Sequence, residues 1–110
     1  MIDIKTITEM NKQFGRGNPI NQQSLEFAIS SAKSTKDWIK QLAFIIRSIL
    51  IDHAFEEGNK RTAAVVLITS FEIRKIAYDP YKVDFIITEI TKKNIRDINK
   101  IRRMIKNATR

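Results

Sequence analysis

Residues 37–52 read DWIKQLAFIIRSILID, and their apolar side chains recur at the spacing of a helix. One face of this predicted helix carries Trp38, Leu42, Ile45, Ile46, Ile49 and Leu50. A second apolar face carries Ile39, Ala43, Phe44 and Ile51. Because two faces are apolar, we expect the helix to be buried nearly all round. Its expected N-cap is Ser34, Thr35 or Asp37, since these residue types accept hydrogen bonds from the first amides of a helix.

Residues 61–77, RTAAVVLITSFEIRKIA, predict a second long helix. The chain has 20 isoleucines and 4 leucines, and β-branched residues also favour strands, above all in the windows 65–71 and 84–90. Residues 61–77 nevertheless contain no glycine or proline. They run for more than about four helical turns, which is too long for an ordinary strand. We therefore predict that both windows are helical.

The N-terminal third predicts two shorter helices and a loop between them. A weak helix over residues 3–13 carries Ile4, Ile7 and Met10 or Phe14 on one side. Residues 15–19, GRGNP, hold two of the three glycines and must form a loop. Asn21 is the expected cap of a helix that continues to about Ser31.

The C-terminal third predicts two more helices. Asp79-Pro80 places a proline at the first position of a helix that continues to about Thr91. Asn94 is the candidate cap of the last helix, whose apolar stripe is Ile95, Ile98, Ile101, Met104 and Ile105. The whole pattern predicts a compact all-α bundle of about six helices around two central buried helices, in one domain spanning residues 1–110.

Composition excludes several classes of protein. The chain of 110 residues has no cysteine and one histidine, which excludes disulfides, thiolate zinc sites and any metal site that needs two imidazoles. No apolar run approaches the roughly 20 residues of a membrane span, and the N-terminus lacks the order of a signal peptide. We therefore expect a soluble, cytoplasmic protein with no membrane partner.

The net charge of +8 is concentrated at the C-terminus. Residues 92–110 contain eight lysines and arginines and one acidic residue, Asp97. A cationic segment of this kind binds a nucleic acid or an acidic protein, or it forms only the solvated face of a helix. Charge alone does not choose among these alternatives, and nucleic acid is the less favoured partner.

The segment His53–Ala63, HAFEEGNKRTA, carries the residues suited to chemistry. It forms a loop that feeds a helix N-terminus, where free amides and the helix dipole favour an anion. Lys60 and Arg61 add positive charge, and Gly58 lets a phosphate approach the backbone. A carboxylate at Glu57 suits Mg2+, and the imidazole of His53 suits proton abstraction from a hydroxyl. These groups are the ones that phosphoryl or nucleotidyl transfer requires.

This segment resembles the H-x-F-x-D/E-G-N-G/K-R motif of the Fic/Doc family. The segment Lys60–Ala63 resembles the Doc (death-on-curing) branch of this family. Typical Fic enzymes carry glycine at the position of Lys60. GRGNPINQQSLEFAI, residues 15–29, also looks like the glycine-rich stretch and helix that precede the motif in this family. The resemblance covers essentially the whole chain.

The resemblance implies a role for each matching residue. His53 is expected to be the general base, Glu57 the Mg2+ ligand and Phe55 the buried anchor of the loop. The expected nucleotide and phosphate site consists of Gly58, Asn59, Lys60 and Arg61. The flap that aligns the target segment is expected at Gly15, Arg16, Gly17 and Asn18.

The sequence departs from the Fic pattern at two telling positions. Ala64 stands where many Fic adenylyltransferases have a second arginine, and Lys60 replaces a glycine. Both changes favour Doc-like transfer of the γ-phosphate of ATP to a hydroxyl of a protein substrate over transfer of AMP, which is the alternative. A further alternative is a non-catalytic binding module that uses the basic C-terminal helix.

The resemblance also implies partners. Self-inhibited Fic proteins resemble one another in an S/T-x-x-x-E-G/N helix whose glutamate occupies the phosphate pocket. Here Glu57 is the only glutamate followed by Gly or Asn, and His53 stands where Ser or Thr is required. The sequence therefore has no self-inhibitory segment, and we expect a separate antitoxin, as for other toxins of toxin–antitoxin pairs. The resemblance points to translation elongation factor Tu or its counterpart as the target, a choice that no residue of this chain encodes.

Overall fold

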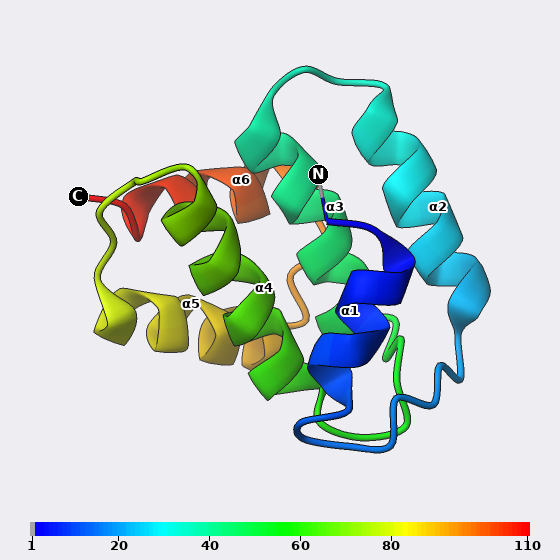
Figure 1. Ribbon diagram of the computed structural model, residues 1–110. Helices are drawn as coiled ribbons and strands as arrows, with labels where there is room; N and C mark the ends of the chain where they lie inside the picture. Colours follow the sequence, from blue (N-terminus) through cyan, green and yellow to red (C-terminus); the bar gives the residue numbers. More distant parts are fainter. Residues whose placement is uncertain (1) are drawn as a thin grey trace.

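The computed structural model describes residues 2–110, which form six α-helices and no β-strand (Figure 1). The helices are α1 (Ile4–Asn11), α2 (Gln22–Lys33), α3 (Trp38–Leu50), α4 (Asn59–Ile73), α5 (Pro80–Lys93) and α6 (Ile98–Asn107). The predicted all-α bundle of about six helices is confirmed. Both isoleucine-rich windows lie inside helices, α4 and α5.

Helix α3 is the centre of the bundle and packs against α2, α4, α5 and α6 (Figure 1). Eight of its thirteen residues are buried, as its two apolar faces predict. Asp37 is its N-cap, and the carboxylate accepts hydrogen bonds from the amides of Ile39 and Lys40. This aspartate also pairs with Arg102 of α6, so the same carboxylate starts one helix and fixes another.

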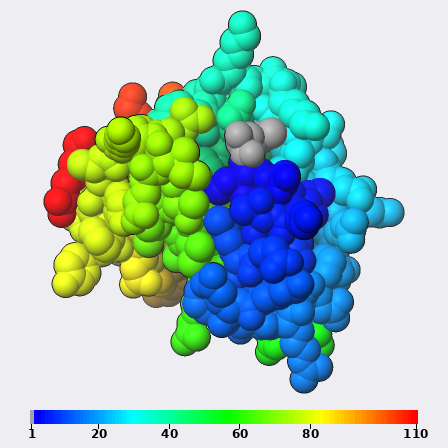
Figure 2. Space-filling model, viewed as in Figure 1, coloured from blue at the N-terminus to red at the C-terminus, as the bar shows by residue number. Residues whose placement is uncertain are grey.

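Helix α4 packs against α1, α3 and α5 and buries one face rather than its whole circumference. Its buried residues are Thr62, Ala63, Val66, Leu67, Ser70 and Phe71. Helix α1 covers the front of the molecule between α4 and α2 (Figure 2). Helix α4 ends at Ile73, before the end of the predicted segment 61–77, because Lys75 adopts a left-handed backbone conformation with φ 57°.

The predicted cap of the last helix is wrong. Asn94 ends α5 instead, in the left-handed conformation (φ 51°), and the amides of Asn94 and Ile95 bond back to carbonyls of α5. This arrangement is a usual C-terminal stop, and asparagine tolerates it better than most residues. The cap of α6 is Asp97, which accepts hydrogen bonds from the amides of Asn99 and Lys100.

The basic C-terminal segment is a packed helix with a charged outer surface. Ile101 and Ile105 of α6 are fully buried, and α6 packs against α3 and α5. Lys100, Arg103 and Lys106 are exposed, as the expected apolar stripe requires. Within residues 2–110, no helix is both long enough and apolar enough to cross a membrane.

Candidate active site

The motif loop connects the C-terminus of α3 to the N-terminus of α4 and places a buried pair, Ala54 and Phe55, between exposed side chains. His53 is exposed and has a left-handed backbone conformation (φ 49°). Phe55 is 0% exposed and belongs to the hydrophobic core, as expected for the anchor of the loop. A buried ring between exposed polar residues holds the backbone against the bundle and leaves His53 and Glu57 at the surface.

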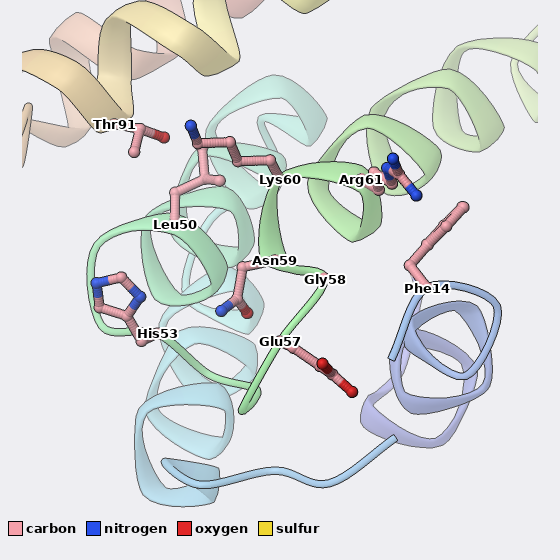
Figure 3. Close-up of a pocket in the computed structure, with 9 residues that line it drawn as sticks. All are labelled: Phe14, Leu50, His53, Glu57, Gly58, Asn59, Lys60, Arg61 and Thr91. Atoms are coloured by element: carbon pink, nitrogen blue, oxygen red, sulfur yellow. The ribbon is translucent and has the colours of Figure 1, made fainter. Parts of the chain in front are cut away.

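Asn59 fixes the loop through two hydrogen bonds to the backbone of Phe55. The amide of Phe55 donates to Asn59 Oδ1 at 3.1 Å, and Asn59 Nδ2 donates to the carbonyl of Phe55 at 2.9 Å. Its carboxamide thus points back to the loop (Figure 3). Asn59 was expected in the phosphate site, and the structure gives its side chain a positioning role, which leaves its backbone amide to face an anion.

The N-terminus of α4 has free amides. Gly58 occupies the N-cap position, and no described side chain caps the helix. The first helical backbone bond runs from the amide of Thr62 to the carbonyl of Gly58, at 2.9 Å. The amides of Asn59, Lys60 and Arg61 have no backbone partner among residues 2–110. A helix of fifteen residues therefore directs three free donors and the positive end of its dipole at the surface.

A pocket of about 450 Å³ opens at this helix end (Figure 3). It brings together His53, Glu57, Gly58, Asn59, Lys60 and Arg61, all of which the motif predicts. It also includes Phe14, Leu50 and Thr91, which sequence reasoning missed because they come from other elements. In Figure 3, His53, Lys60 and Thr91 lie on one side of the start of α4, and Glu57, Arg61 and Phe14 lie on the other.

The two cations of the pocket differ in their surroundings. The guanidinium of Arg61 lies over the ring of Phe14, with 6.0 Å between its central carbon and the ring centroid. The side chain of Lys60 extends toward Leu50 and Thr91 (Figure 3). Both cations are exposed, and neither forms an ion pair with another residue in the described part of the chain. Their charges are available to an anion.

The glycine-rich loop lies directly beside the motif loop. Pro19 and Phe55 form an antiparallel bridge. The amide of Glu56 donates to the carbonyl of Asn18 at 3.1 Å, and Asn18 Nδ2 donates to the carboxylate of Glu56 at 3.2 Å. Residues 15–19 thus lie against residues 55 and 56 of the motif loop, and the role of Gly15–Asn18 as a flap stays a prediction. None of these residues lines the pocket itself.

Gly58 is required by packing as well as by backbone conformation. Its φ is 75°, in the left-handed region, and a Cβ at this position would lie 3.0 Å from the Cβ of Phe14 and 3.1 Å from its carbonyl. The sequence suggested that this glycine leaves space for a phosphate. In the structure, Phe14 fills the space, and it thereby becomes a wall of the pocket.

Asn11 is a buried polar residue that joins the glycine-rich loop, the motif and α4. Its Nδ2 donates to the carbonyl of Glu57 at 2.8 Å and to Thr62 Oγ1 at 3.0 Å. Its Oδ1 accepts from the amide of Gly17 at 3.0 Å. Sequence reasoning missed this residue. The available signal was an asparagine four residues after Ile7, on the face of α1 that packs on the bundle.

Glu57 is the carboxylate that suits a magnesium ion. It is exposed, lines the pocket, and forms no ion pair with any residue from 2 to 110, whereas Glu56 is bound to Asn18. Residues 2–110 contain no cluster of three histidine, cysteine or carboxylate side chains that would enclose a metal alone. Magnesium in phosphoryl-transfer sites commonly uses one or two carboxylates together with substrate phosphates, so a single glutamate fits.

Comparison of the chain with protein-family models, with curated proteins and with solved structures finds no match. The Fic/Doc resemblance therefore rests on the motif and on the glycine-rich stretch that precedes it.

Proposed function

We propose that this protein transfers the γ-phosphate of ATP to a hydroxyl of a protein target, as a Doc-like toxin of a toxin–antitoxin pair. The observation that carries the proposal is the uncapped N-terminus of α4. It opens on a pocket whose lining includes two unpaired cations, one free carboxylate and an exposed imidazole. A binding module for anions needs the amides and the cations, but it does not need a base beside them.

The phosphates of ATP would bind at the start of α4. The free amides of Asn59, Lys60 and Arg61 are donors to phosphate oxygens, and the side chains of Lys60 and Arg61 neutralise their charge. Glu57 would hold a magnesium ion. When bound, this ion offsets the charge that develops on the phosphates during transfer. The protein's contribution is mainly positioning and electrostatic stabilisation.

His53 supplies the proton acceptor. The target hydroxyl oxygen forms a bond to the γ-phosphorus, and the bond from that phosphorus to the bridging oxygen of ADP breaks. The hydroxyl proton passes to a ring nitrogen of the His53 imidazole. Exposure of His53 suits a substrate as large as another protein.

The proposal includes the partners that the resemblance implies. A separate antitoxin restrains the enzyme, and the target is a protein hydroxyl, with translation elongation factor Tu or its counterpart as the first candidate. The use of ATP fits a cytoplasmic location.

The proposal is tested by incubating the purified protein with a cell extract and with ATP that is labelled at either the γ- or the α-phosphate. We expect label from the γ-phosphate on a protein band, and a loss of about 100- to 10,000-fold in the His53→Ala variant, because a general base contributes that much. The melting temperature of the variant should equal that of the wild type, since His53 is exposed. Label from the α-phosphate would indicate AMP transfer, and label from neither would contradict catalysis.

A further inference from the structure

Helix α5 exposes two aromatic side chains one turn apart. Tyr81 is 87% exposed and Phe85 is 61% exposed. Phe85 forms one wall of a groove of about 470 Å³ between α5 and α6, together with Lys82, Ile86, Met104 and Asn107. In Figure 2, side chains of α5 (yellow) stand out from the left edge of the molecule. Aromatic residues and methionine are enriched in protein interfaces, where they supply most of the binding energy.

The two helices that form this groove carry an excess of positive charge. Helices α5 and α6 contain seven lysines and arginines and two acidic residues, Asp84 and Glu89. Five of these cations are exposed and form no ion pair with any residue of the described chain, namely Lys82, Lys92, Lys100, Arg103 and Lys106. Lys82 lines the groove itself, and Glu89 pairs with Lys93. The groove therefore combines an apolar lining with a net positive charge on the helices that form it.

We propose that the groove between α5 and α6 binds an amphipathic, acidic helix of another protein. Apolar side chains of the partner pack on Phe85, Ile86 and Met104, and its carboxylates face Lys82, which lines the groove, and the exposed cations of α6. A helix suits the shape because a groove between two helices accepts side chains at positions i, i+3, i+4 and i+7. The groove shares no lining residue with the pocket at the start of α4, so this proposal does not depend on the proposed kinase activity.

Charge and shape favour this partner over the two other occupants. A second copy of the chain carries the same net charge of +8, and the same positively charged helices would face each other. A single-stranded nucleic acid would supply negative charge and stack on Tyr81 and Phe85. The apolar lining of the groove, however, includes Ile86 and Met104, which suit aliphatic side chains better than the flat faces of bases.

The proposal is tested by peptide display, with the full protein as bait. The library consists of random peptides, each long enough for about four helical turns. We expect enriched peptides with apolar residues at helical spacing, flanked by glutamate and aspartate. Phe85→Ala and Lys82→Glu should each weaken an enriched peptide about tenfold or more, the loss typical of a central interface residue. Phe27→Ala and Lys33→Glu are the matched controls, because Phe27 is 63% exposed and both residues lie on α2.

Several outcomes would overturn the proposal. These are enrichment of no peptide, enrichment of peptides without acidic residues, and equal losses for the control variants on α2. Binding of a short single-stranded RNA that Phe85→Ala removes would assign the surface to nucleic acid. A dimer in sedimentation that Phe85→Ala dissociates would assign it to a second copy. Circular dichroism checks that the variants fold. If Phe85→Ala does not fold, Tyr81→Ala replaces it, because this substitution also removes an exposed aromatic ring from α5.

Discussion

Replacement of Gly58 by alanine should destabilise the protein through two separate effects. The first is conformational, because an L-residue with a Cβ pays about 1–2 kcal/mol in the left-handed region where Gly58 lies, with φ 75°. The second is steric, because the new Cβ would lie 3.0–3.1 Å from the Cβ, carbonyl carbon and carbonyl oxygen of Phe14. Forcing backbone apart in a packed region costs about 1–3 kcal/mol. We expect a total loss of about 2–5 kcal/mol in the free energy of unfolding.

Gly17→Ala is the matched control that separates these effects. Gly17 also has a positive φ, of 65°, but its Cβ would meet side-chain atoms of Lys12, with Cγ at 2.5 Å, and no backbone. Lys12 is exposed, so a change of rotamer relieves this contact and costs only the exposed ion pair of Lys12 with Glu9. Gly17→Ala should therefore show the conformational cost without most of the steric one. Urea denaturation of the wild type and the two variants measures the steric contribution as the difference between the variants, expected at about 1–3 kcal/mol. Two results would show that Phe14 does not constrain this position. The free energy of unfolding of Gly58→Ala could lie within about 0.5 kcal/mol of the wild-type value, or Gly58→Ala could lose no more stability than Gly17→Ala.

Three further perturbations test the core, the metal ligand and an ion pair. Phe55→Ala should cost about 3–5 kcal/mol of stability in urea denaturation, because the ring is fully buried; an unchanged midpoint would contradict its anchoring role. Glu57→Gln should abolish the magnesium dependence of ATP affinity in titration calorimetry, and Glu56→Gln, whose side chain is bound elsewhere, should preserve it. Burial raises the pKa of Asp37, but the hydrogen bond from Arg102 and two backbone amides outweigh it and hold that pKa below its ordinary value of 3.8. The stability from this carboxylate is complete above pH 3.8 and disappears as the pH falls below it. Arg102→Gln should therefore destabilise the protein more at pH 7 than under acidic conditions. An equal loss of stability at both pH values would show that the ion pair of Asp37 with Arg102 does not stabilise the fold.

The helices could be predicted from the sequence because each has a periodic apolar face, even where isoleucine and valine favour strands. The boundary near residue 94 could not be predicted by the same reasoning. Asparagine is common both at the N-cap of a helix and at a left-handed C-terminal stop. Asp97, which caps α6, lies only three residues later. The choice depends on where Ile90 and Ile95 pack, and both are buried in the core.

The candidate site could be predicted only as far as it is continuous in sequence. Six motif residues line one pocket because they lie within nine consecutive residues, 53–61, of one loop and the helix start that follows it. Phe14 and Thr91 reach the same pocket from the end of α1 and from α5, and no local pattern marks them. Asn11 is a related case, because its three hydrogen bonds join segments that are far apart in the sequence.

The motif residues fall into two groups with different physical roles. Phe55, Gly58 and Asn59 hold the loop through a buried ring, a left-handed turn and two backbone hydrogen bonds, and any rigid loop of this shape would need such residues. The side chains of His53, Glu57, Lys60 and Arg61 form no hydrogen bond or ion pair with another residue from 2 to 110. The guanidinium of Arg61 does contact the ring of Phe14, which is itself a wall of the pocket. The proposed function rests on these four groups, because ATP with magnesium, the ligand that we propose, would give them the polar partners that residues 2–110 do not.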